Sequence, residues 1–213
     1  NNHSEDHTDD VIKDFADPRL HLEHIHNQGI IAASRNRGIT RSRGEWVAFL
    51  DSDDAWEPDK LQRSLDGVGD DVDLISHREA VVRDGKVLSV SPRHKAADAA
   101  YRRLLFDGTC FSPSAALVRR AQLEKIGGFR EDSEFVTVED YDLWLRLAKA
   151  GAKVHFVDAV LSSYRLHDGN ASGAIVRHMN AGLFAVETHY RELAPKHALD
   201  GLRLRVRRAM IIY

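Results

Sequence analysis

Three carboxylates occur within four residues at positions 51–54, directly after an apolar run. Their mutual repulsion and their desolvation require an opposing charge. A divalent cation held by oxygen ligands supplies that charge, and Mg²⁺ or Mn²⁺ in such a site shares its coordination shell with substrate phosphates. The alternative is a solvated loop, because Asp and Ser also favour turns and helix caps. The position of Asp51, Asp53 and Asp54 at the end of a buried strand favours the metal site.

A second acidic group, Glu139-Asp140-Tyr141-Asp142, opens a predicted helix over 139–150. A carboxylate at a helix start that is open to a cleft can take the proton from an attacking hydroxyl, as a general base. The alternative is structural, since acidic residues at a helix N-terminus also cap the helix and interact favourably with its dipole. The sequence offers no other segment as suitable for the role of base.

An arginine is predicted on the inner face of a helix over 30–41. In that helix Ile31, Arg35 and Ile39 share one face at spacings of four. An arginine among core-directed residues needs an acidic partner or an anionic or polar ligand. Arg35 therefore pairs with a nearby aspartate or extends to solvent, or it binds such a ligand.

Alternating strands and helices position these residues. The apolar run 46–50 is typical of a strand buried in a parallel sheet, and Asp84-Gly85 is the turn of a hairpin. Further strands are predicted at 19–25, 72–76, 113–118, 153–157 and 160–166. Further helices are predicted at 11–16, 96–106, 120–126, from 174 onward, and after Pro58 with an inner stripe of Leu61, Leu65 and Val68. The pattern predicts an α/β fold with a mostly parallel sheet flanked by helices, in which ligands bind at the carboxyl ends of the strands.

The bulk properties narrow the function classes. The chain has 213 residues, a net charge of −3 and one cysteine, Cys110. The length suits one domain with a short appendage, and the absence of a basic excess argues against a nucleic-acid partner. One cysteine cannot build a disulfide framework, which favours a reducing, cytoplasmic compartment. No run of 18 apolar residues that could span a bilayer is present in the sequence.

The C-terminal segment 202–208 is basic and has helical spacing. Such a segment is usually a solvated helix face. With its stripe of Leu202, Val206 and Ala209 it could instead lie on an acidic membrane surface. The protein is therefore predicted to be cytoplasmic, either free or peripheral to the inner face of a membrane.

Six separated segments occur in an order that is specific to one enzyme family. They are NQG at 27–29, ASRNRGI at 33–39, GEWVAFLDSDDAWEP at 44–58, GGF at 127–129, EDYDLWLR at 139–146 and YRLH at 164–167. Together they resemble the motifs of the family 2 glycosyltransferases with the GT-A fold. The resemblance covers about residues 1–172 and is much more specific than any single motif.

The resemblance implies an inverting transfer of a sugar from a nucleotide-diphosphate donor of the UDP or GDP type. The acceptor would be a glycan or a lipid-linked molecule in surface polysaccharide or glycan synthesis. Asp51 and Asp53 match the family's DXD metal motif, with Asp54 beside them, and would hold Mn²⁺ or Mg²⁺ against the donor diphosphate. The metal would neutralise the leaving group, and His167 would reach the metal or the diphosphate. Asp140 matches the catalytic base, and Arg35 matches a position that contacts the nucleotide base.

The start of the chain departs from the family pattern. Asn1 and Asn2 stand where the family's second strand ends and where an aspartate commonly binds the nucleotide. The chain is therefore interpreted as a GT-A core over 1–172 that lacks the first β-α-β segment, followed by a helical extension over 173–213. Two alternatives remain open, a non-catalytic GT-A-like binding domain and a sugar-phosphate nucleotidyltransferase, which also uses acidic metal ligands on an α/β sheet.

Overall fold

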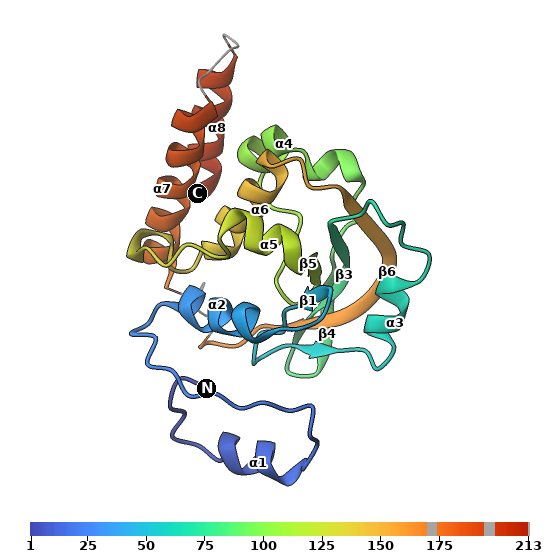
Figure 1. Cartoon of the computed structure of the whole chain (residues 1–213). Coiled ribbons are helices and arrows are strands. Elements are labelled where there is room, and N and C mark those ends of the chain that lie inside the picture. Colours follow the sequence, from blue (N-terminus) through green and yellow to red (C-terminus); the bar gives the residue numbers. More distant parts are fainter. Residues whose placement is uncertain (170–173, 194–198, 213) are drawn as a thin grey trace.

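The computed structural model describes residues 1–169, 174–193 and 199–212 (Figure 1). Within these residues a six-stranded sheet has the order β1-β5-β3-β6-β2, and β4 pairs with β3. The strands are β1 (Trp46–Ala48), β2 (Ala55–Trp56), β3 (Leu74–Arg83), β4 (Lys86–Val90), β5 (Ala116–Arg119) and β6 (Val154–Arg165). The α-helices are α1 (Thr8–Asp14), α2 (Ile31–Arg41), α3 (Lys60–Leu65), α4 (Tyr101–Asp107), α5 (Arg120–Ile126), α6 (Glu139–Lys149), α7 (Ile175–Leu193) and α8 (Asp200–Ile212). Two short 3₁₀ helices are η1 (Ala96–Ala99) and η2 (Ser133–Phe135).

The sheet is mixed and flanked by helices, as predicted, but it is not mostly parallel. Among the pairings in the described residues only β3 with β6 is parallel, and the other four are antiparallel. A parallel pair requires a long crossover, and the chain between β3 and β6 supplies one that includes α4, α5 and α6. The apolar run at 46–50 forms the short strand β1 at the end of the strand order, with an antiparallel partner, β5. Val47 and Phe49 are buried as expected, but Leu50 is 47% exposed.

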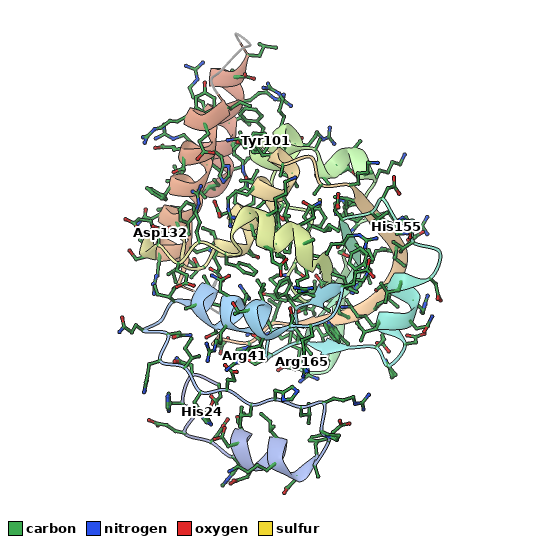
Figure 2. All side chains as sticks on the ribbon, viewed as in Figure 1. His24, Arg41, Tyr101, Asp132, His155 and Arg165 are labelled. Carbon is green, nitrogen blue, oxygen red and sulfur yellow. The ribbon has the colours of Figure 1, made fainter. Side chains whose placement is uncertain are left out.

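Helix α6 is the central helix of the core. Leu143, Trp144, Leu145 and Leu147 are all buried in it, so the helix is enclosed on nearly every side. Side chains crowd the space around α5 and α6, whereas the segment that carries His24 stands apart from that core (Figure 2). The base candidate at the start of α6 thus stands on one of the best-packed elements of the molecule.

Two element predictions are wrong, and the two strands predicted at 153–157 and 160–166 are one strand, β6. Residues 19–25 form no strand, and Leu20 is exposed; a short alternation cannot make a strand without a partner to complete its hydrogen bonds. In α3 the inner face is formed by Lys60 and Ser64, while Leu61 and Leu65 are 47% and 40% exposed. The Lys60 ammonium lies 3.7 Å from the centre of the Trp56 ring, and this aromatic contact stabilises its inward position.

The C-terminal helices α7 and α8 lie side by side and pack against the core next to α4 and α6 (Figure 1). Asp200 at the start of α8 is fully buried and pairs with Arg102 of α4. The helix expected from residue 174 onward is thus a pair of helices in the described residues. No helix in these ranges combines the length and the apolar character needed to cross a membrane.

Candidate active site

A cavity of about 850 Å³ brings together the ends of several elements. It is bordered by α2, the loop after β1, the start of α6, the turn after β6, and helices α7 and α8. All the side chains that the sequence singles out for chemistry line this one cavity: Arg35, Asp51, Asp53, Asp54, Asp140 and His167. The structure thus brings these six side chains together, and the role of each stays a prediction.

Arg35 links the two acidic segments. Only 14% of its side chain is exposed, and its guanidinium donates to Asp51 Oδ1 and to Glu139 Oε1, each at 2.6 Å. Burial disfavours the cation, but Asp51 and the two carboxylates at the start of α6 raise the pKa of Arg35 overall. The inward arginine therefore has acidic partners, which was one of its two predicted environments. Its contact with a nucleotide stays a prediction.

Asp54 is turned toward the protein. Its Oδ2 accepts a hydrogen bond from Ser114 Oγ at 2.6 Å, and its Oδ1 accepts one from the Arg165 backbone N–H at 3.0 Å. Burial raises the pKa of Asp54, while these two hydrogen bonds oppose the rise. The fully buried Ser114 Oγ also accepts from the Asp51 N–H at 3.1 Å, which fixes the loop. Metal binding by Asp54 stays a prediction.

Asp53 and His167 meet on the cavity wall. His167 Nε2 lies 3.0 Å from Asp53 Oδ2, and the Gly169 N–H donates to His167 Nδ1 at 3.1 Å. Both side chains are partly exposed. With Nδ1 accepting, the neutral ring carries its proton on Nε2, so binding a metal there would move the proton to Nδ1.

These donors suit a metal that is shared with a substrate. In the described ranges no three His, Cys, Asp or Glu side chains are gathered as a complete metal site. Mg²⁺ and its relatives are commonly held by one or two protein carboxylates together with substrate phosphates and water. Asp53, with His167 after the tautomer change, meets that requirement.

Asp140 is half-buried at the start of α6 and lines the cavity. Its Oδ1 accepts a hydrogen bond from the Tyr141 N–H at 2.7 Å. Burial and the charge of Glu139 raise the pKa of Asp140 to about 6, and Arg35 opposes the rise. A carboxyl group with a pKa near the working pH is suited to take up a proton during a reaction.

The turn before α6 is strained and held by hydrogen bonds. Thr137 has a φ of +81°, which is rare for a β-branched residue. Its N–H donates to Glu139 Oε2 at 2.8 Å, and its hydroxyl lies 3.2 Å from His178 Nδ1 of α7. The buried Glu139 therefore connects Arg35, the strained turn and the base candidate.

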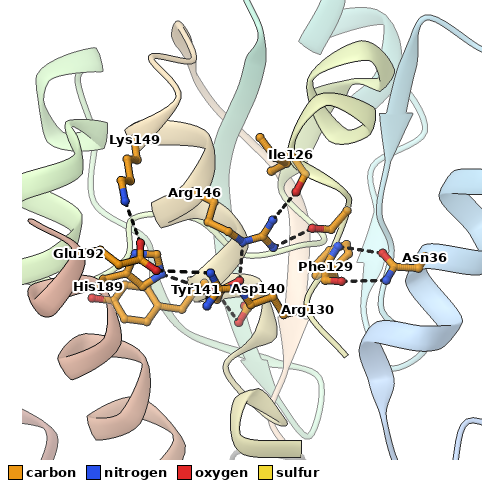
Figure 3. A network of polar contacts seen from close by, with 12 residues as sticks. Asn36, Ile126, Phe129, Arg130, Asp140, Tyr141, Arg146, Lys149, His189 and Glu192 are labelled. Atoms are coloured by element: carbon orange, nitrogen blue, oxygen red, sulfur yellow. Dashed lines mark hydrogen bonds and ion pairs between the residues drawn. The ribbon is translucent and has the colours of Figure 1, made fainter. Parts of the chain in front are cut away.

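A polar frame behind the cavity fixes α6 relative to α2 (Figure 3). Arg146 of α6 donates to the carbonyl oxygens of Ile126 and Gly128 at 3.0 and 2.7 Å. Asn36 of α2 exchanges two hydrogen bonds with the backbone of Phe129, both 2.8 Å long. A Cβ at Gly128, whose φ is +68°, would lie 2.5 Å from Asn36 Oδ1, so only glycine fits this junction. The glycine pair that follows α5 thus allows the contact between Asn36 of α2 and the segment before α6.

Four further residues contact or line the site without a role predicted from the sequence, namely Glu139, Ser114, Thr137 and Arg207. Glu139 had a signal, because it precedes Asp140 in the acidic motif. Ser114 and Thr137 come from segments with no motif of their own, and Arg207 belongs to the basic segment 202–208, whose pattern indicates a surface helix. Only the folded arrangement shows them.

Comparison with known proteins gives the family. Residues 1–127 match "Glycosyl transferase family 2". The chain belongs to this family. Among its relatives is the amylovoran biosynthesis glycosyltransferase AmsB of Erwinia amylovora, 32% identical over 142 residues, which are 63% of this chain and 46% of AmsB. The chain spans about half to two thirds of the length of the curated relatives that it matches.

Solved structures show the fold of this family 2 chain. Staphylococcus aureus TarS, in a crystal structure with UDP-GlcNAc, has a TM-score of 0.71 at 18% identity, covering 95% of this chain and 59% of that one. A mannosyltransferase of Pyrobaculum calidifontis, PcManGT, in complex with GDP-Man and Mn²⁺, has a TM-score of 0.57 at 15% identity. The match covers 100% of this chain and 70% of that one. The GT-A fold predicted from the motifs is confirmed.

Proposed function

We propose that this chain carries the active site of a glycosyltransferase that moves a sugar from a nucleoside-diphosphate donor to an acceptor hydroxyl. The observation that carries the proposal is the position of Asp140, with its pKa raised to about 6, in one cavity with Asp53 and His167. A base and a site for a charged leaving group thus border the same space. The relationship to the amylovoran enzyme supports a role in polysaccharide synthesis.

The donor is a UDP or GDP sugar in this proposal, because the similar structures contain UDP-GlcNAc and GDP-Man. Asp53 and His167 would hold Mn²⁺ or Mg²⁺, in line with the Mn²⁺ of the mannosyltransferase complex. When bound, the metal neutralises charge that develops on the departing diphosphate. Asp51, fixed by Arg35, borders the donor on the side of α2.

Asp140 acts as the general base. It takes the proton of the acceptor hydroxyl while that oxygen bonds to the anomeric carbon and the bond from this carbon to the diphosphate oxygen breaks. Attack opposite the leaving group inverts the anomeric configuration. Arg35 keeps Glu139 in place beside Asp140, and the frame of Arg146 and Asn36 holds α6 still during the step.

The test measures heats of binding of UDP and GDP, with Mn²⁺ and then with EDTA, and separately the turnover of a nucleotide sugar. We expect metal-dependent binding that Asp53→Asn abolishes and Asp140→Asn keeps. Asp140→Asn should lower turnover by about 100- to 10,000-fold, since it removes general-base catalysis. Near-full turnover of Asp140→Asn contradicts the assignment of the base.

The product distinguishes the two alternative functions. Release of pyrophosphate in place of a nucleoside diphosphate would identify a nucleotidyltransferase. Nucleotide binding without any turnover, in a chain shown to be folded, would identify a binding domain.

We also propose that α8 contacts a membrane surface. Leu202, Val206 and Ala209 are all exposed, at about half for the two larger side chains. Arg203, Arg205 and Arg208 lie on the same exposed helix. An apolar stripe flanked by cations suits the interface of an anionic bilayer.

A further inference from the structure

Arg207 of α8 lines the cavity together with Tyr141 of α6. Its guanidinium lies 5.8 Å from the centre of the Tyr141 ring. The Nε atom is buried and has no hydrogen-bond partner among the described residues. Gly108 leaves room for this side chain, since a Cβ there would lie 3.2 Å from the nearest guanidinium nitrogen.

The two arginines that line the cavity differ in their partners. Arg35 forms ion pairs with two carboxylates, those of Asp51 and Glu139, which neutralise its charge. In the part of the chain that the structure describes, Arg207 forms no ion pair. A cation with an unused buried donor on a cavity wall is suited to an anionic ligand, because a guanidinium binds carboxylate and phosphate groups through paired hydrogen bonds.

Arg203 of the same helix provides a comparison for Arg207. It lies one turn earlier, and its guanidinium is 5.0 Å from the centre of the Phe106 ring. Both arginines thus lie over an aromatic ring, but Arg203 does not border the cavity. Packing on an aromatic ring alone does not account for a side chain that reaches into the site.

We propose that Arg207 binds an anionic group of the acceptor, a phosphate or a carboxylate, and so selects acidic acceptors. This inference rests on the proposed function, in which Asp140 meets the acceptor hydroxyl. Arg207 and Asp140 line the same cavity, and Arg207 lies over the ring of Tyr141, the residue that follows Asp140. The donor diphosphate belongs at the Asp53 end, where the metal supplies the positive charge.

The test uses three sugars that differ only at carbon 6, namely glucose, glucose 6-phosphate and glucuronic acid. Their binding to the full chain is measured by ligand-observed NMR in EDTA, which removes metal-mediated phosphate binding, and again with UDP and Mn²⁺ present. We expect one or both acidic sugars to bind about tenfold more tightly than glucose, as one charge-assisted hydrogen bond provides. Tighter binding of glucose 6-phosphate would indicate an acceptor with a phosphate group, and tighter binding of glucuronic acid would indicate one with a carboxylate.

Three variants test whether Arg207 causes the preference for acidic sugars. Arg207→Gln should abolish the preference, Arg207→Lys should retain much of it, and the matched control Arg203→Gln should leave it unchanged. Circular dichroism tests whether each variant is folded. If Arg207→Gln is not folded, the sugar preference of Arg207→Lys and competition by inorganic phosphate test the role of Arg207 instead. Equal binding of the three sugars, no binding of any at millimolar concentration, or an unchanged preference in Arg207→Gln overturns the inference.

The same samples separate this inference from the proposed function. Metal-dependent UDP binding without a preference for acidic sugars leaves the donor site standing and removes the Arg207 subsite. A preference that depends on Arg207, without any UDP binding, removes the proposed donor site instead. Loss of the acidic-sugar preference when UDP is added would place Arg207 in the donor site and overturn the acceptor assignment.

Discussion

Asp140 lies between an anion and a cation that move its pKa in opposite directions. Burial and Glu139 raise the pKa to about 6, and Arg35 lowers it. The base must be deprotonated to work, so kcat/KM should fall about tenfold per pH unit below about 6 and level off above it. Glu139→Gln removes the neighbouring negative charge and keeps an acceptor oxygen for Arg35. We therefore predict that this variant moves the acid limb of the pH profile to lower pH.

The control for this prediction is Glu134→Gln, which alters an exposed glutamate in η2 that does not border the cavity. Its pH profile of kcat/KM should match that of the unmodified chain. An acid limb that stays in place in Glu139→Gln would show that the charge of Glu139 does not raise the pKa of Asp140.

Ser114 fixes the acidic loop through hydrogen bonds with Asp51 and Asp54, which leads to a second prediction. Ser114→Ala removes the donor to Asp54 and leaves the Asp51 N–H without its acceptor. We expect a loss of about 1–3 kcal/mol in the free energy of unfolding and a roughly 10- to 100-fold weaker metal-dependent binding of UDP. Ser162→Ala is the matched control, because Ser162 is also a buried serine that donates to a carboxylate, Glu79. It should cost similar stability in urea denaturation yet leave nucleotide binding intact.

Helix α3 carries a buried amine whose protonation opposes folding. Only 1% of Lys60 is exposed, and its burial lowers the pKa to about 7, with Glu79 opposing. The unfolded chain, with an ordinary pKa near 10.5, binds this proton more tightly. The destabilising contribution is therefore fully present below pH 7, and it is relieved as the pH rises from about 7 toward 10.

Lys60→Met should accordingly stabilise the chain at pH 7 by roughly 2–4 kcal/mol, after the loss of the Trp56 contact is allowed for. The advantage over the unmodified chain should shrink at pH 9. Urea denaturation at both pH values measures it, and Lys86→Met, at an exposed position of β4, is the control. An advantage that is the same at both pH values would contradict the account.

Most helices and the hairpin were predictable from the sequence because local signals define them. The turn Asp84-Gly85 has positive φ at both residues, and Gly127 ends α5 in the left-handed conformation, as their residue types indicate. The inner face of α3 was not predictable, because the spacing of Leu61 and Leu65 gave no sign that Trp56 would draw Lys60 inward. Strand direction was missed for a similar reason, since pairing partners are set by distant segments.

At the scale of the whole molecule, the cavity depends on segments far apart in the chain. Motifs predicted the acidic loop, Arg35 and Asp140, because each had a residue type and a position that required an explanation. Ser114 lies in the turn before β5 and Arg207 lies on α8, and only the fold brings them to the acidic loop and to the cavity. Arg207 further shows that α8 belongs to the site as well as to the surface.

The position of α8 leads to a prediction for the whole molecule at a membrane. The helix lines the cavity with Arg207 and Ile211, while Leu202 and Val206 face outward, so contact through the outer face would bring the cavity close to the bilayer. We predict that the chain sediments with vesicles that contain anionic lipid, that it binds neutral vesicles much less, and that salt weakens the binding.

Val206→Glu should reduce sedimentation about tenfold because it places a negative charge on the apolar stripe. Leu88→Glu alters an exposed leucine of β4 and should have no effect. Equal binding to neutral and anionic vesicles, or full binding by Val206→Glu, would exclude α8 as the membrane contact.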